Sequence, residues 1–153
     1  MMDKEKDKDK DTTRSLSRVL EKVQDAETAG RFIEAHGEKK FNYFYEYLNY
    51  IIASKELIPA DVIRRSGISR NYVYNILNGI KKKPGRDKVL ALCIGSSMTF
   101  SETQKALEIA GLAPIYPRND RDVWIAVAIN QGVSSVLQVN LMLEKQNMEP
   151  LDV

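Results

Sequence analysis

Apolar residues recur at helical spacing along most of the chain. Between residues 41 and 53 they gather on one side of a helical wheel and polar residues gather on the other, which predicts an amphipathic helix. The apolar set is Phe41, Phe44, Leu48, Ile51 and Ile52. Six of the ten residues from 41 to 50 are aromatic, and the wheel places most of them on or beside the apolar face. We therefore expect these rings to pack in a core rather than to form a base-stacking platform.

Two short helices joined by a glycine turn are expected next. Pro59 suits the first turn of a helix that runs to about Arg65, because the N–H that proline lacks would be unpaired there. Gly67 suits the left-handed residue that follows a helix. Ser69 offers a side-chain oxygen as N-cap for a second helix over residues 70–77. This order is that of a helix-turn-helix.

The second half of the chain contains a repeat. An apolar run over residues 89–94 predicts a fourth helix, and Thr99 and Glu102 have the spacing of a capping box that opens a fifth. Residues 86–94 line up with residues 121–129, 35 positions later, and the match resumes at an offset of 36 after one extra residue. A duplicated helical hairpin is the interpretation.

These patterns predict an all-α fold of about seven helices without a sheet. A five-helix domain containing the helix-turn-helix is expected over residues 39–112, and a C-terminal hairpin that repeats helices four and five over residues 113–153. Residues 1–12 alternate acids and bases, which predicts a disordered charged tail. Residues 13–38 carry apolar positions at helical spacing, which predicts an amphipathic arm. The arm requires a partner surface, in its own chain or in a second protomer.

Length and composition are those of a globular protein without membrane contact. The 153 residues are 43% hydrophobic and 29% charged, which suits one compact unit. The apolar runs fall short of the roughly 20 residues of a membrane helix, and the start of the chain has no apolar secretion signal. We therefore expect a cytoplasmic protein. The single cysteine, Cys93, lies inside an apolar run and is expected to be a core thiol.

Positive charge is concentrated in one segment. The whole chain has a net charge of +2, whereas residues 61–88 hold eight basic and two acidic residues. Such a local excess is typical of a surface that neutralises phosphates, although a solvated lysine-rich loop would give the same count. The phosphate-contact candidates are Arg64, Arg65, Lys81, Lys82, Lys83, Arg86 and Lys88.

The helix expected over residues 70–77 has an unusual polar face. Asn71, Asn75 and Asn78 gather opposite its apolar side chains, with Tyr74 at their edge. Asparagine is a mediocre helix former, but its amide can donate to N7 of adenine and accept from N6. Arg70 is placed to reach a guanine edge or a phosphate. A merely polar surface remains the alternative.

Residues 41–112 resemble the lambda-repressor-like (Cro/Xre type) helix-turn-helix domain of bacterial and phage regulators. The matching positions are Leu57, Val62, the run from Ser66 to Arg70, Ile76, Gly79 and the apolar helix after Pro84. Residues 62–118 also resemble a less characterised set of helix-turn-helix proteins of Gram-positive bacteria. The resemblance implies a homodimeric regulator of transcription that binds double-stranded DNA with residues 69–78 in the major groove. It implies base-reading roles for Ser69, Arg70, Asn71, Tyr74 and Asn75.

Three positions depart from the family pattern and keep a second function open. Ile63 stands where the family usually has a small residue, Pro59 where it often has a phosphate-binding glutamine, and Ile58 where it has a serine or threonine cap. The alternative is a protein-interaction adaptor that no longer binds DNA and uses the N-terminal arm or the C-terminal hairpin.

No enzymatic function is expected. His36 is the single histidine and lies in a polar stretch, and the sequence contains no nucleophile elbow, phosphate loop or cluster of metal ligands. We therefore expect no cofactor and no metal. Asp87 and Asp122 occupy equivalent places at two predicted helix starts, where stabilisation of the positive helix end explains them.

Overall fold

The computed structural model describes residues 18, 20–22, 24–29, 31 and 40–153. The chain divides into two compact units, Met1–Lys40 and Phe41–Val153. In the first, residues 26–29 are helical, and Asp25 caps them by accepting a hydrogen bond from the Thr28 N–H at 2.7 Å. The predicted charged tail, most of the predicted arm and His36 lie outside the described residues, so the domain boundaries drawn from the sequence stay predictions.

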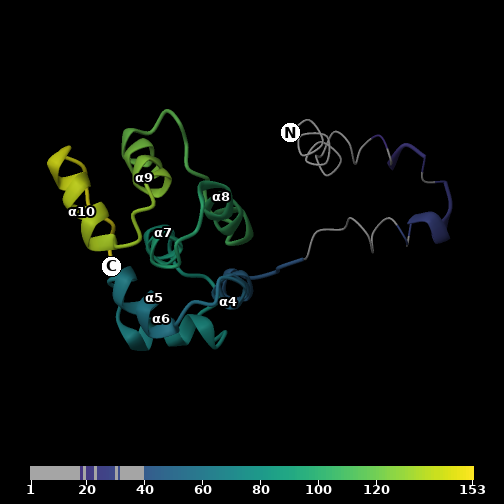
Figure 1. Cartoon of the computed structure of the whole chain (residues 1–153), viewed down its shortest axis with the longest axis horizontal. Coiled ribbons are helices and arrows are strands. Elements are labelled where there is room, and N and C mark those ends of the chain that lie inside the picture. The colour runs from purple at the N-terminus through teal and green to yellow at the C-terminus, as the bar shows by residue number, and fades with distance from the viewer. Residues whose placement is uncertain (1–17, 19, 23, 30, 32–39) are drawn as a thin grey trace, which may run out of the picture. The chain divides into compact units, whose positions relative to one another are not determined.

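Seven helices and no strand are found in the described residues from 41 to 153, which confirms the all-α prediction (Figure 1). They are α4 (Phe44–Ser54), α5 (Pro59–Ser66), α6 (Arg70–Leu77), α7 (Arg86–Gly95), α8 (Phe100–Ile109), α9 (Asp120–Asn130) and α10 (Val136–Lys145). In Figure 1, α7 lies in the middle of this unit, with α4, α5 and α6 on one side and α8 and α9 on the other.

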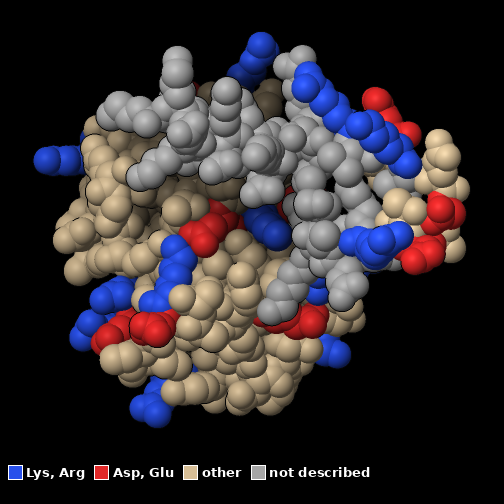
Figure 2. Space-filling model, turned by 45° about the vertical axis from the view of Figure 1, so that its right-hand side comes forward, with Lys and Arg blue, Asp and Glu red and all other residues tan. Residues whose placement is uncertain are grey.

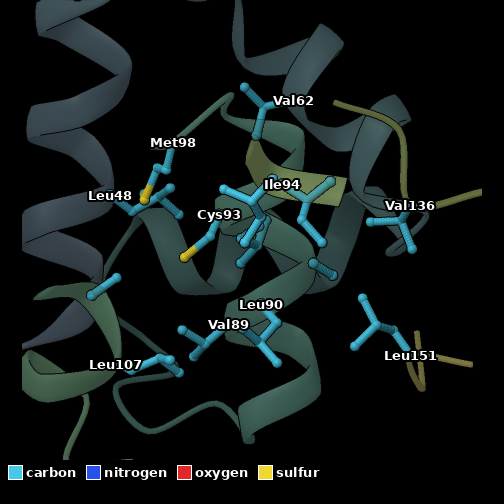
Figure 3. Close-up of a cluster of buried hydrophobic side chains, with 14 of the residues drawn as sticks. Leu48, Val62, Val89, Leu90, Cys93, Ile94, Met98, Leu107, Val136 and Leu151 are labelled. Atoms are coloured by element: carbon cyan, nitrogen blue, oxygen red, sulfur yellow. The ribbon is translucent and has the colours of Figure 1, made fainter. Parts of the chain in front are cut away.

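Helix α7 is the centre of the core because it is apolar all round. All of its residues from Val89 to Gly95 are buried, as expected for a helix without a polar face. Figure 3 shows side chains from α4, α5, α8, α10 and the C-terminal segment gathered around it, among them Leu48, Val62, Leu107, Val136 and Leu151. Cys93 is fully buried, which raises the pKa of its thiol and confirms the prediction of a core cysteine.

Helices α5 and α7 approach closely at a glycine. A Cβ atom at Gly95 would lie 2.9 Å from the carbonyl oxygen of Val62 and 3.1 Å from the backbone nitrogen of Ser66. Both atoms belong to the backbone of α5, so a larger residue would push the two helices apart. Gly95 therefore sets how closely α5 packs on the core.

Helix α4 begins three residues later than the apolar pattern predicts. Tyr43 is extended, with φ −131° and ψ 151°, and Phe44 is the first helical residue. The Glu46 carboxylate accepts hydrogen bonds from the backbone N–H groups of Asn42 (3.2 Å) and Tyr43 (3.0 Å), which fixes this start. The predicted core role of the aromatic residues holds for most of them: Phe44 and Tyr47 are buried, and two others are half-buried.

The two short helices and their glycine turn agree with the prediction. Pro59 begins α5, and Gly67 has the left-handed φ of +70°. The Ser69 hydroxyl accepts a hydrogen bond from the Tyr72 N–H at 3.3 Å, as an N-cap does. Buried Ser66 ties the turn together, because its hydroxyl donates to the carbonyl of Ile63 and accepts from the N–H of Ile68.

The hairpins α7–α8 and α9–α10 repeat one another in their hydrogen bonds. The side-chain amide of Gln104 in α8 donates to the carbonyl of Ile115 and accepts from its N–H. Asn140 in α10 makes the same two bonds with Leu151. Both residues of the second set lie 36 positions after those of the first, which confirms the predicted duplication.

Crossed ion pairs join the two hairpins. Arg86, which begins α7, binds both carboxylate oxygens of Asp122 in α9 at 3.0 and 2.8 Å. Arg121 of α9 binds both oxygens of Asp87 in α7 at 3.2 and 3.0 Å. Because each hairpin contributes equivalent residues to the other, the contact is reciprocal, as at the interface of a symmetric dimer.

Position at a helix start is therefore an incomplete explanation of Asp87 and Asp122. Burial raises the pKa of Asp87, but hydrogen bonds from Arg121 and from the Asp152 N–H, with the charges of Arg121 and Arg86, lower it more. The pKa of Asp87 lies below its ordinary value as a result. Asp87 and Asp122 therefore join the two hairpins, in addition to stabilising the positive ends of their helices.

Candidate nucleic-acid interface

Helix α6 presents a polar face beside the turn. Asn71 and Asn78 are exposed, whereas Val73 and Ile76 are fully buried. Asn75, predicted to share the exposed face, is only half-buried, because the chain folds back over the end of α6. Its carbonyl oxygen accepts hydrogen bonds from the N–H groups of Ile80 at 2.9 Å and Lys81 at 2.8 Å. This closure brings the basic loop next to the helix.

Helix α4 holds the end of α6. The Asn49 side-chain amide donates to the carbonyl of Leu77 at 3.0 Å, which satisfies one of the unpaired carbonyls at the end of the helix. Gly79 follows with a φ of +75°, and a Cβ atom there would lie 3.1 Å from the Tyr45 ring. The path of the chain into the basic loop is thus fixed by a side chain of α4.

Three lysines lie over tyrosine rings around α6. The ammonium groups of Lys81 and Lys88 lie 5.4 and 5.5 Å from the centroid of the Tyr72 ring. The Lys82 ammonium lies 5.2 Å from the centroid of the Tyr43 ring, which stacks on the ring of Tyr45 in α4. Cation–π contact restrains these side chains without neutralising them. Positive charges from the loop and from α7 are thereby gathered beside α6.

The first turn of α6 carries two further candidates. Arg70 is exposed, and its guanidinium carbon lies 5.4 Å from the Tyr74 ring centroid, which extends the side chain along the helix. Tyr74 itself is half-buried. Ser69 is exposed, but its hydroxyl oxygen already accepts the Tyr72 N–H, so it has one donor left for a ligand.

The remaining basic candidates fall into two groups. Lys81, Lys82 and Lys83 are exposed, as is Arg64, which contacts Asp61 on its own helix at 3.3 Å, whereas Arg65 is half-buried. Arg86 is placed differently. Its guanidinium makes four hydrogen bonds within the fold, to Asp122 and to the carbonyls of Ala113 and Pro114. Contact with a phosphate would compete with them, so Arg86 is assigned to the fold and left out of the interface.

Residues 61–88 remain strongly basic when Arg86 is left out of the interface. Arg86 and Asp87 both pair between the hairpins, and without them residues 61–88 still carry seven basic residues and one acidic residue. On the face drawn in Figure 2, blue and red side chains lie among larger uncharged areas. The excess of positive charge is counted from the sequence of residues 61–88, against a net charge of +2 for the whole chain.

Sequence reasoning missed Tyr43 and Tyr72. On the helical wheel of α6, Tyr72 falls at the border of the apolar face, where a ring is half-exposed and available to a cation. That position was the only signal. Which lysines reach the rings depends on the path of the loop, and local patterns do not give this path.

No protein-family model, curated protein or solved structure matches the chain. Within the described residues, no helix is both long and apolar enough to cross a membrane. That part of the chain also holds no group of three or more His, Cys, Asp or Glu side chains able to bind a metal ion together.

Proposed function

We propose that the chain is a sequence-specific regulator of transcription that binds double-stranded DNA, with α6 in the major groove. One observation carries the proposal: an exposed polar helix face has lysines from the following loop and from α7 held beside it on tyrosine rings. The resemblance of residues 41–112 to lambda-repressor-like domains supports the same function. A homodimer would place two such helices on the two halves of a symmetric site.

Base reading and phosphate contact fall to different residues in this proposal. Exposed Asn71, in the first turn of α6, offers an amide that pairs with the N6 and N7 edge of adenine, and Arg70 offers a fork for guanine. Tyr74 and Asn75 are half-buried, and the hydroxyl of exposed Ser69 already accepts a backbone hydrogen bond, so these three residues supply secondary contacts. The exposed lysines of the loop contact phosphates, which position the helix but carry no sequence information.

The proposal is tested by fluorescence-anisotropy titration against a random duplex library at two salt concentrations, followed by sequencing of the retained DNA. We expect enrichment of a short inverted repeat. Asn71→Ala should cost on the order of 1 to 3 kcal/mol at specific positions of that site and leave binding to random duplex unchanged. Lys82→Ala should weaken binding to all sequences and reduce the salt slope by about one.

Arg118→Ala provides the matched control, because Arg118 is exposed but lies outside the basic segment, between α8 and α9. It should leave both the sequence preference and the salt slope unchanged. Equal loss of affinity on all sequences in Asn71→Ala would contradict base reading by α6. Absence of binding at low salt would contradict the proposal as a whole.

A protein-interaction adaptor is the second candidate function. It is favoured by two exposed isoleucines that flank α5 and α6: Ile58, just before α5, is 62% exposed, and Ile80, after α6, is 72% exposed. The Ile58 side chain has no polar atom with which to contact a phosphate. Under this function, DNA binding is absent at low salt, whereas Ile58→Gln and Ile80→Gln weaken capture of a stoichiometric protein partner.

A further inference from the structure

Helix α10 exposes a strip of leucine. Leu137 is 70% exposed and Leu141 is 56% exposed, one helical turn apart, on the side opposite the buried residues Val136, Val139 and Leu143. A shallow hollow of about 710 Å³ opens beside the strip, lined by Leu141, Met142, Glu144 and Lys145. Neighbouring exposed leucines beside a hollow mark a surface that gains free energy when another surface covers it.

The duplicated hairpin provides an internal comparison. Ser101 and Lys105 of α8 stand 36 positions before Leu137 and Leu141. In α8 the Lys105 side chain is half-buried and its ammonium lies 5.9 Å from the rings of both Phe41 and Tyr47, whereas Ser101 is exposed. The first hairpin thus carries polar residues at these two positions, where the second hairpin carries exposed leucines. The shared fold of the repeat therefore does not require leucine there.

The charges along α10 favour a second copy of the same helix as the cover. If two α10 helices pair antiparallel about Leu141, position 145 lies beside the partner's position 138 and position 144 lies beside the partner's position 137, because the members of each pair share one flank of the leucine strip. The Lys145 ammonium can then donate to the side-chain oxygen of the partner's Gln138. The methylene groups of Glu144 cover the partner's Leu137, with the carboxylate in water. No two like charges face each other, so the surface is self-complementary.

We infer that α10 is a homodimer interface, formed by antiparallel contact of the Leu137–Leu141 strip with the same strip of a second chain. The contact is isologous, so the dimer buries four leucines, Leu137 and Leu141 of each chain. It leaves α6 and the basic loop untouched and places a twofold axis at the C-terminal hairpin. The inference concerns association without DNA and does not depend on the proposed function.

The test is sedimentation equilibrium of the full chain without DNA over a range of concentrations. We expect a dimer. The variant Leu137→Ser with Leu141→Lys gives α10 the residues that α8 carries, and it should raise the dimer dissociation constant by on the order of a hundredfold or more. Helical circular dichroism should stay unchanged, since both positions are exposed. Tyr116→Gln, which alters an exposed aromatic residue outside α10, is the matched control and should associate like the unaltered chain.

Charge changes at Gln138 test the antiparallel register. Gln138→Glu places a carboxylate beside the partner's Lys145 and should tighten the dimer severalfold, whereas Gln138→Lys places like charges together and should loosen it by a similar factor. An unaltered chain that is monomeric at its highest soluble concentration would overturn the inference. So would a double-leucine variant that dimerises as tightly as the unaltered chain. If both Gln138 variants act alike, the antiparallel contact is wrong.

Discussion

Removal of the Asp122 carboxylate should strongly lower the free energy of unfolding. The Asp122 side chain is 5% exposed, accepts two hydrogen bonds from Arg86 and accepts a third from the Tyr116 N–H at 3.0 Å. Asp122→Ala leaves the guanidinium and the N–H without this partner. Breaking a buried pair typically costs 3 to 5 kcal/mol, and because Arg86 keeps 25% exposure we expect the lower end, about 3 kcal/mol.

Urea unfolding followed by helical circular dichroism and by the fluorescence of Trp124 measures this cost. Trp124 is the single tryptophan and lies on α9, two residues from Asp122. Coincident transitions from the two probes would show that the hairpin unfolds with the rest of the unit. In a double-mutant cycle, Arg86→Ala and Asp122→Ala should couple by about 2 kcal/mol.

The equivalent ion pair of the repeat, Arg121 with Asp87, supplies the control. Asp87 is 27% exposed and Arg121 is 23% exposed, so solvent screens this pair more, and Asp87→Ala should cost about 1 to 2 kcal/mol. Arg64, which contacts Asp61 and lies outside the crossed pairs, should couple to Asp122 by less than about 0.5 kcal/mol. If Asp122→Ala costs less than about 1 kcal/mol, or no more than Asp87→Ala, then the crossed pairs do not hold the hairpins together.

Three further outcomes follow from the core and the hairpin contact. Gly95→Ala should lower the free energy of unfolding by about 2 kcal/mol, because the new Cβ would meet the α5 backbone. Gly85→Ala is the control and should cost about 0.5 kcal/mol, because a Cβ there meets nothing within 4 Å; equal costs in urea unfolding would contradict the close approach. Because folding lowers the pKa of Asp87, its carboxylate stabilises the fold fully above the ordinary pKa of 3.8, and this stabilisation is lost as the pH falls through the pKa of the folded state. Asp87→Asn should therefore reduce the loss of stability in acid, and an unaltered profile of stability against pH would count against this. Cys93 should react with a thiol reagent only as the protein unfolds, because burial raises its pKa and blocks access; rapid labelling of the folded protein would refute this.

The helices could be predicted from the sequence because their ends are set by nearby residues. Ser69 caps α6 through a residue three positions on, and Gly67 takes the left-handed conformation that ends α5. Thr99 and Glu102 form the expected capping box of α8, with bonds of 2.9 and 3.1 Å. The one displaced start, at α4, has a local cause too: the Glu46 side chain caps a helix that apolar periodicity alone would extend to Phe41.

Contacts between distant residues could not be predicted in this way. The alignment of the repeats shows Arg86 with Arg121 and Asp87 with Asp122, but it does not show that each arginine crosses to the other repeat. Arg86 was therefore counted with the basic surface residues. The same limit applies to Tyr72, whose ring meets Lys81 and Lys88 only because α6 closes onto the loop. Periodicity identifies a face but not what lies against it.

The crossed pairs connect the second hairpin to the candidate interface. Asp87 and Lys88 are consecutive residues at the start of α7, and the first is fixed by Arg121 while the second lies over the Tyr72 ring of α6. The Asp152 N–H also donates to Asp87, and a Cβ at Gly67 would lie 3.3 Å from Val153. The C-terminal segment thus contacts both the glycine turn before α6 and the helix after the basic loop. Because both flanks of α6 are braced by the second repeat, its packing controls how rigidly the polar face of α6 is presented.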